Sequence, residues 1–250
     1  AMKRTILLGL ALALASSPAH AQDRRNGGTP ANANPGGVVA EELAFARLAQ
    51  DKGQWTAFRE TATKDAVMFA PQMVYVQEHL KDRANPPQAV KWQPHQVWSS
   101  CDGSLAVTRG AWQRPDGTSG WFTTVWQKQK NGRYKWVLDQ GDVLPMPLDE
   151  PDMVVSKTAD CPAGYRGNRG LKIQDFKGKL PPLDPARRTG QSLDGTLGWE
   201  ATIAPNGSRR FIVTMQTEGQ RVTVQDAQVE AHVRQRVEDL CARFPIYEGL

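Results

Sequence analysis

The sequence lacks most of the short motifs that identify common enzyme classes. It has no Gly-x-Ser-x-Gly, His-Glu-x-x-His, P-loop or dinucleotide-binding fingerprint, so serine hydrolases, zinc proteases and nucleotide-binding folds of those kinds are not expected. Cysteine is scarce, at 3 residues, and histidine at 4. None of them forms a Cys-x-x-Cys pair or a paired Cys/His spacing, so the sequence predicts no metal site and no cofactor.

Long apolar runs are also missing beyond the first residues of the chain. The run at 6–15 follows Lys3 and Arg4 and precedes Ala-His-Ala at 19–21, which is the pattern of a bacterial secretory signal peptide. It is too short to span a bilayer. We therefore expect a signal peptide over residues 1–21, cleaved after Ala21, and a periplasmic or secreted mature protein without a transmembrane segment. A retained membrane anchor is the alternative.

The chain has little excess of either charge. There are 31 basic and 26 acidic residues; removing Lys3 and Arg4 leaves 29 against 26, a net charge of +3. The basic residues are dispersed among acidic ones, which is typical of a solvated surface. Together with the expected secretion, this argues against a nucleic-acid partner.

The three cysteines predict one disulfide and one remaining thiol in an oxidising compartment. Cys161 and Cys241 bracket the C-terminal region, and we favour a bridge between them. Closing so long a loop contributes about 4 kcal/mol in the chain-entropy model. A Cys101–Cys161 bridge is the alternative.

Composition and turn signals divide the mature chain into four parts. Residues 22–37 are a polar Gly/Pro/Asn stretch that reads as a disordered tether. Two helices followed by strands then predict an α+β domain, and a Pro-, Gly- and charge-rich irregular connector follows it. The last part predicts a small β-meander, with turns at Asn206-Gly207 and Glu218-Gly219, and a terminal helix. The boundaries are 38–145 for the domain, 146–192 for the connector and 193–250 for the C-terminal unit.

Turn signals separate four strand candidates within the α+β domain. We see no internal repeat that links these strands to the C-terminal β-meander beyond shared turn chemistry. The candidates are residues 89–100, 104–114, 120–130 and 132–142.

The last two of these strands form a hairpin around Asn131-Gly132, a pair typical of a two-residue type I′ turn. That turn pairs Val125 with Leu138 and places Trp126 and Trp136 on opposite faces of the sheet. Both faces then carry large apolar groups, so both must be covered. The second cover is either a partner subunit or the C-terminal region.

Three stretches resemble the SnoaL-like, or nuclear transport factor 2-like, superfamily: TATKDAVMFAP (61–71), LAVTRGAW (105–112) and NGRYKWVLDQGD (131–142). The resemblance covers residues 38–145. It implies a cone-shaped, curved antiparallel sheet packed on N-terminal helices (the cystatin-like fold), often with an apolar pocket and often dimeric through the sheet face. It implies no particular reaction.

The groups that serve catalysis in the resembled family are absent from the matching positions. Ketosteroid isomerases carry an Asp base immediately before the proline of the first motif, where this chain has Ala70. Secreted relatives often carry His in the last strand, where Leu138 and Gln140 stand here. Two weak catalytic candidates remain, His95 and Asp139; a structural His and a loop-holding Asp are the competing interpretations.

We therefore favour a secreted, non-catalytic binding or interaction protein whose pocket takes a small apolar or aromatic ligand. One alternative is a small-molecule isomerase or hydratase/hydrolase that uses His95 or Asp139 as a base. Another is a structural homodimer whose cone is filled by its own side chains. The residues predicted to line the pocket are Tyr75, His95, Arg109, Trp121, Gln127, Trp136 and Gln140.

Overall fold

The computed structural model describes residues 32–70, 72–165, 167, 176 and 178–230. The expected signal peptide, the terminal helix and Cys241 lie outside these residues. Among the described residues, no helix combines the length and apolar character needed to cross a membrane.

The first helix begins earlier than the sequence pattern predicts. Helix α1 spans Pro35–Lys52, and the side chain of Asn34 accepts a hydrogen bond from the Gly37 N–H. An Asn cap followed by Pro in the first turn is a strong start signal, because Pro needs no N–H there. The cap therefore extends the helix into the residues assigned to the tether. Gly53, at φ 95°, separates α1 from α2 (Gln54–Thr61).

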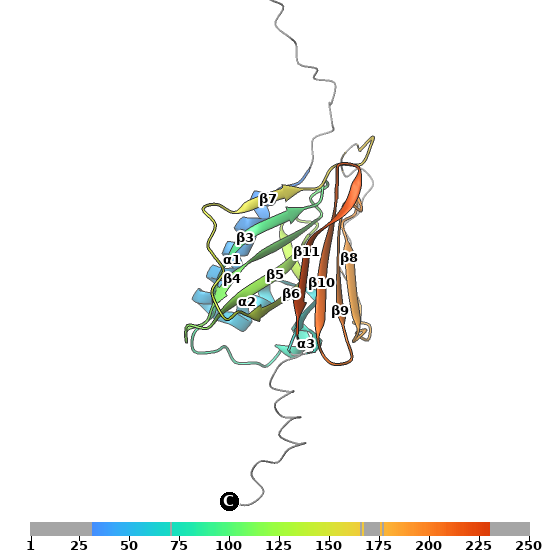
Figure 1. Cartoon of the computed structure of the whole chain (residues 1–250). Coiled ribbons are helices and arrows are strands. Elements are labelled where there is room, and N and C mark those ends of the chain that lie inside the picture. The colour runs from blue at the N-terminus through green and yellow to red at the C-terminus, as the bar shows by residue number, and fades with distance from the viewer. Residues whose placement is uncertain (1–31, 71, 166, 168–175, 177, 231–250) are drawn as a thin grey trace, which may run out of the picture.

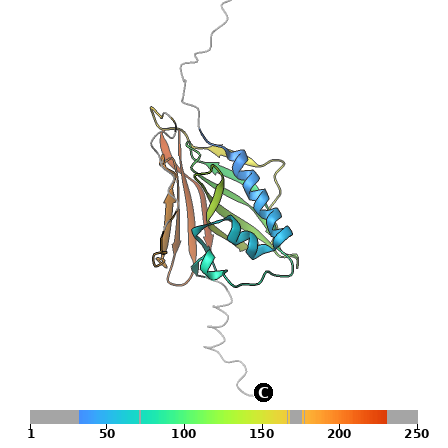
Figure 2. The same cartoon turned by 180° about the vertical axis from the view of Figure 1, so that it is seen from behind.

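Seven strands form one curved sheet behind which α1 and α2 lie (Figures 1 and 2). The strand order is β2-β1-β6-β5-β4-β3-β7. The four central strands form the predicted antiparallel meander, whereas β1 pairs with β6, and β7 with β3, in parallel. The predicted α+β cone is confirmed. The elements are β1 (Ala62–Phe69), β2 (Met73–Tyr75), α3 (Val76–His79), β3 (Lys91–Ser99), β4 (Leu105–Gln113), β5 (Ser119–Lys128), β6 (Tyr134–Val143) and β7 (Val155–Thr158).

The hairpin between β5 and β6 has a three-residue loop, not the predicted type I′ turn. The Gln129 N–H donates to the Arg133 carbonyl at 2.7 Å, and the Gly132 N–H donates to the Gln129 carbonyl at 2.9 Å. Type I′ requires a positive φ at both central residues, but Gly132 alone of the Asn131-Gly132 pair has one, at 83°.

A bulge then moves the two tryptophans of this hairpin to the same face. Val125 pairs with Leu138 as predicted, but Trp126 pairs with Trp136, so Val137 is the extra residue. A bulge reverses the alternation of side chains on the residues beyond it. Trp126 and Trp136 both face the helices, and the prediction that they lie on opposite faces is wrong.

The C-terminal unit is a second antiparallel sheet, in the order β11-β10-β9-β8. The predicted turns at residues 206–207 and 218–219 are present. The connector at 146–192 is not wholly irregular, because it contributes β7 and β8. The strands are β8 (Arg187–Gln191), β9 (Leu197–Ile203), β10 (Arg209–Thr217) and β11 (Gln220–Val229).

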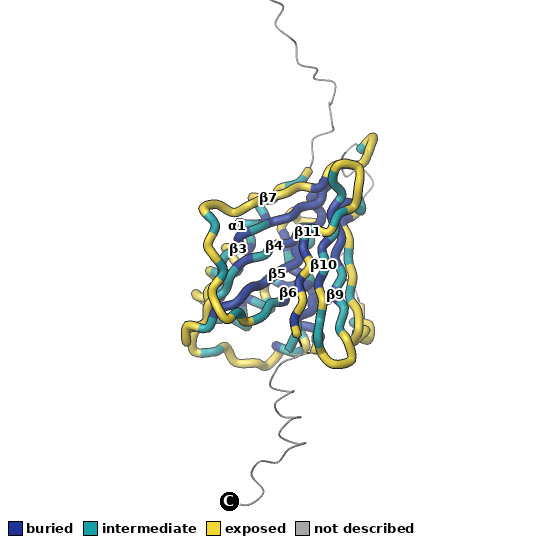
Figure 3. Tube along the Cα trace, in the orientation of Figure 1, coloured by how far each residue is buried: buried dark blue, intermediate teal, exposed yellow. Residues whose placement is uncertain are grey.

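The second sheet covers the outer face of the first sheet. Val125 and Leu138 of the first sheet share one buried core with Trp199, Phe211 and Val213 of the second. Figure 3 shows buried segments of both sheets facing each other. The cover is thus the chain's own C-terminal region. A homodimer through this face, as predicted, has no free surface over the part that the second sheet occupies.

Two loops with the pattern Ser-x-Asp-Gly-Ser/Thr-Leu, at 100–105 and 192–197, have the same internal structure. In the first, Asp102 Oδ1 accepts hydrogen bonds from Ser100 Oγ at 2.6 Å and from Ser104 N and Oγ at 2.9 and 2.8 Å. In the second loop, Asp194 Oδ1 accepts the equivalent hydrogen bonds from Ser192 Oγ at 2.6 Å and from Thr196 N and Oγ1 at 3.0 and 2.9 Å. We call the pair the clasp.

The two loops of the clasp bind each other reciprocally. The Cys101 N–H donates to Thr196 Oγ1 at 3.0 Å, and the Leu193 N–H donates to Ser104 Oγ at 2.9 Å. Contacts that repeat with the partners exchanged define a local two-fold axis.

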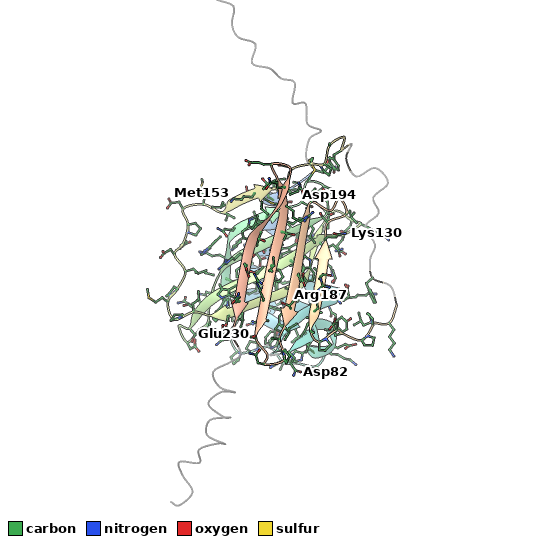
Figure 4. All side chains as sticks on the ribbon, turned by 45° about the vertical axis from the view of Figure 1, so that its right-hand side comes forward. Asp82, Lys130, Met153, Arg187, Asp194 and Glu230 are labelled. Carbon is green, nitrogen blue, oxygen red and sulfur yellow. A yellow bond between two sulfur atoms is a disulfide. The ribbon has the colours of Figure 1, made fainter. Side chains whose placement is uncertain are left out.

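Each loop joins the first two strands of a four-strand meander, so β8–β11 repeat the order of β3–β6. The two β-regions therefore share more than turn chemistry, contrary to the sequence reading. Figure 4 shows Asp194 at one end of the second sheet and Glu230 at the other.

The disulfide joins Cys101 to Cys161, with their Sγ atoms 2.02 Å apart and their Cα atoms 5.1 Å apart. The favoured Cys161–Cys241 pairing is wrong, and the alternative is the one formed. The reason lies in β7, which runs parallel to β3. Both strands end at the same edge of the sheet, so Cys161 arrives beside Cys101 in the clasp.

Candidate functional site

A cavity of about 560 Å³ lies at the wide end of the cone, between the helices and the concave face of the first sheet. Its walls come from α1, α2, five strands of the first sheet (β1, β3, β4, β5 and β6) and β10 of the second. Aromatic side chains dominate them: Phe45, Trp55, Phe58, Phe69, Trp92, Trp112 and Phe122.

The narrow end of the cone is filled. Trp126 and Trp136 are 1% and 0% exposed, and Phe45 lies 6.2 Å from both rings, measured between centroids. Trp136 Nε1 also donates to Thr61 Oγ1 at 2.8 Å. The cone is therefore neither hollow throughout nor filled throughout. Its packed end fixes the walls of the open end.

Glu42 places a carboxyl group in this packed end, on the buried stripe of α1. Oε1 accepts from Trp92 Nε1 at 2.8 Å, and Oε2 accepts from Thr108 Oγ1 at 2.6 Å and Trp126 Nε1 at 2.9 Å. Burial raises the pKa of Glu42, and these hydrogen bonds oppose that shift. No cation accompanies the carboxyl group among the ion pairs of the described residues.

Glu42 is not among the residues predicted from the sequence, although its position gives a signal. The buried residues of α1 are Val38, Glu42, Phe45 and Ala49. An acid at a position of the helical apolar stripe is uncommon unless the fold supplies hydrogen-bond donors for it.

Asp139 lies on β6 where the strand passes the cavity. Its side chain is partly accessible and lines the cavity wall. Thr124 Oγ1, on the neighbouring strand, donates to Asp139 Oδ2 at 2.8 Å. The pKa of Asp139 is raised to about 8: burial is the largest cause, the negative charge of Glu42 acts in the same direction, and the Thr124 hydrogen bond opposes the shift. At neutral pH this carboxyl group is mainly protonated and can donate a hydrogen bond.

Two threonines connect the acids. Thr108 and Thr124 are paired on adjacent strands; the hydroxyl of Thr108 donates to Glu42 and that of Thr124 to Asp139. The two carboxyl groups are close enough for the charge of one to raise the pKa of the other. The arrangement supplies one neutral acid at the cavity wall and one buried acid behind it.

Several predicted lining residues lie elsewhere, because the second sheet turns their face into a core. Tyr75 and Trp121 pack between the two sheets. The guanidinium of Arg109 lies 5.5 Å from the centroid of the Trp121 ring, and burial lowers its pKa. None of the three lines the cavity.

Three further predicted lining residues lie in three different places. Trp136 belongs to the packed end of the cone. Gln127 lines a separate, wider hollow of about 1120 Å³ with a charged rim that includes Lys64, Asp65 and Lys135. Gln140 does line the aromatic cavity.

His95 lies in the bulge of β3 between Pro94 and Gln96. It is 9% exposed, and its Nε2 has no hydrogen-bond partner among the described residues. Burial lowers its pKa, with the charge of Glu150 opposing. His95 does not line the aromatic cavity. Of the two catalytic candidates, Asp139 is the one that lines this cavity.

No protein-family model and no curated protein matches the sequence. A protein from Parabacteroides distasonis, provisionally named a ketosteroid isomerase, is similar in structure at 12% identity and a TM-score of 0.36, over 43% of this chain and 89% of that one. Two NTF2-like proteins of unknown function are also similar. The one from Shewanella baltica has 15% identity and a TM-score of 0.33, over 43% and 92% of the two chains. The one from Pseudomonas aeruginosa has 17% identity and a TM-score of 0.31, over 42% of this chain and 97% of that one.

The arrangement of the helices and strands agrees with the resemblance that the sequence motifs indicated. Two N-terminal helices pack on the concave face of a sheet whose four central strands form a meander. The described part of the chain has the α+β cone that this resemblance implies, to which it adds a second sheet.

Proposed function

We propose that the protein binds a small, largely apolar or aromatic molecule in the cavity at the mouth of the cone. Asp139, as a neutral acid, donates a hydrogen bond to an acceptor such as a carbonyl oxygen on that molecule. The observation that carries this proposal is a carboxyl group with a pKa of about 8 in a wall of aromatic side chains.

The walls and the volume support the same proposal. A cavity of about 560 Å³ lies within the usual range of small-molecule sites, which are mostly apolar with a few polar groups. Aromatic walls favour a ligand that removes apolar surface from water, at about 25 cal/mol per Å². A single neutral acid in such a wall recognises an acceptor without the cost of burying a charge.

The test is the binding of the fluorescent ketone 6-propionyl-2-dimethylaminonaphthalene between pH 5 and 9.5. We expect affinity to be constant at low pH and to fall through about pH 8, as Asp139 ionises and loses its donor. Asp139→Asn keeps a donor and removes the pH dependence; Asp149→Asn, at an exposed site, retains it. If the wild-type protein does not bind the ketone, the proposal is wrong.

Proton transfer at carbon is a second candidate function, favoured by the coupling between Asp139 and Glu42. A general base acts in its ionised form, so the rate would rise through pH 8 while binding falls. The same ketone has exchangeable α-hydrogens, and their replacement in D₂O can be followed by mass spectrometry. Acceleration that Asp139→Asn abolishes supports an enzyme; exchange at the uncatalysed rate supports binding alone.

We also propose that the protein acts in the periplasm or outside the cell. The Cys101–Cys161 bridge supports this, since disulfides persist mainly in oxidising compartments. Fractionation of the source cells, with an N-terminal sequence of the mature protein, tests it. A cytoplasmic protein that keeps residues 1–21 contradicts it.

A further inference from the structure

Arg209 extends from the second sheet into the wall of the cone cavity. It is the first residue of β10, and its Nη2 donates to the carbonyl of Gly141 on β6 at 2.6 Å. Its Nε lies 3.4 Å from Gln140 Oε1. The guanidinium lies 4.8 Å from the centroid of the Phe69 ring, and both side chains line the cavity. The second sheet thus contributes a cation to a site formed mainly by the first.

No carboxylate among the described residues forms an ion pair with this cation, because none places an oxygen within 4 Å of Arg209. Burial lowers the pKa of Arg209, and the charge of Asp142 opposes that shift. The next residue in sequence shows the contrast. Arg210 makes two hydrogen bonds to Asp226, at 2.9 and 2.5 Å, on the opposite face of β10. A half-buried guanidinium with unused donors is costly without an anion.

The other charges at the cavity mouth leave it net positive. Arg114, which lies 4.9 Å from the Trp112 ring centroid, joins Arg209 there, and Asp142 is the opposing charge. Asp139 contributes little charge at neutral pH because its raised pKa keeps the carboxyl group mainly protonated. Two cations and one anion favour an anionic group at the entrance over a neutral one.

We propose that the ligand is an amphipathic anion whose carboxylate is bound by Arg209 at the mouth and whose apolar body lies against the aromatic walls. This rests on the proposed function of the cavity and adds the charge of its ligand. A guanidinium matches a planar carboxylate in two hydrogen bonds. The second sheet therefore has a role in specificity in addition to covering the first sheet.

The experiment compares 6-(dimethylamino)-2-naphthoic acid with its methyl ester, which has the same ring system without the charge. At pH 7 and low salt, we expect the wild-type protein to bind the acid about tenfold more tightly than the ester, since a charge-assisted hydrogen bond exceeds a neutral one by roughly that factor. Raising the salt concentration should weaken binding of the acid and leave the ester unchanged.

Arg209→Gln should remove the preference for the acid and keep the affinity for the ester. Arg210→Gln, the same change one residue away on the other face, should keep both. If Arg209→Gln does not fold, Arg209→Lys is the second variant. It retains the charge and should retain a reduced preference for the acid over the ester, which is measured at two salt concentrations. A purely structural Arg209 would change both affinities together.

The outcomes separate this inference from the proposal beneath it. Ester binding without preference for the acid, or a preference that survives Arg209→Gln, overturns the role of Arg209 and leaves a neutral-ligand cavity. Failure of the wild-type protein to bind either compound, or the ketone, overturns the cavity's binding function itself.

Discussion

Asp102 and Asp194 each accept a hydrogen bond from the backbone N–H of the other, at 2.8 Å to Asp194 Oδ2 and 3.1 Å to Asp102 Oδ2. They lie in the two loops of the clasp, far apart in the sequence, one from each sheet. Because every bond has its counterpart, neither loop can shift without losing bonds at both. The clasp holds the second sheet on the outer face of the first at the end where the disulfide also lies.

Asp194→Asn should destabilise the protein by about 2 kcal/mol, since the carboxylate accepts several charge-assisted hydrogen bonds and an amide nitrogen cannot replace either oxygen. Urea denaturation followed by tryptophan fluorescence measures this. Asp116→Asn is the matched control: Asp116 also accepts from a backbone N–H two residues on, but in an exposed turn. A loss no larger than that of the control contradicts a stabilising role for the clasp.

The covered outer face predicts a monomer. In the resembled family this face often binds a second copy, whereas here the second sheet packs Trp199 and Phe211 against it. Light scattering after size-exclusion chromatography, at protein concentrations up to about 100 µM, should give the mass of one chain. A stable dimer would mean that another surface, or the part outside the described residues, mediates association.

Stability should fall as the pH rises from about 4 to about 8. The pKa of Asp139 is raised in the folded protein to about 8 from an ordinary value of 3.8. The folded state then binds more protons than the unfolded state throughout that interval, so deprotonation favours unfolding. Asp139→Asn should reduce this slope in urea titrations at successive pH values. An unchanged slope would show that the group titrates normally.

Glu42→Gln should destabilise the protein by about 3 kcal/mol, because the amide nitrogen must face one of the buried donors, Trp92, Trp126 or Thr108. It should also lower the pKa of Asp139 by removing a neighbouring negative charge. Thermal unfolding and carboxyl ¹³C NMR measure the two effects. Glu41→Gln, which affects an exposed ion pair with Arg133, should cost less than about 1 kcal/mol.

Peptide mapping without reduction should recover Cys101 linked to Cys161 and Cys241 in a peptide of its own. Cys161→Ser should lower the free energy of unfolding by about 2–4 kcal/mol, because the bridge restricts the unfolded chain. Cys241→Ser is the control and should leave it unchanged. A Cys161–Cys241 peptide would overturn the pairing.

Local signals determined much of the architecture. Asn34 and Pro35 mark the start of the first helix, and turns that contain Gly mark the ends of strands in both sheets. These signals are local because caps and turns depend on neighbouring residues alone. The Asn131-Gly132 turn signal also placed Val125 opposite Leu138. These local signals could not locate the bulge at Val137. The bulge depends on which side chains must pack on each face of the sheet, and the local sequence pattern does not identify this.

Tertiary structure decided the site. The parallel pairing of β7 with β3 places Cys161 beside Cys101. The second sheet covers Tyr75 and Trp121, so these predicted pocket residues belong to the core between the sheets. The raised pKa of Asp139 depends on burial and on the charge of Glu42, which lies on a helix much earlier in the chain. The sequence by itself determined most of the helices, strands and turns. Only the folded chain set the charges and contacts of the cavity, because those depend on residues brought together from distant segments.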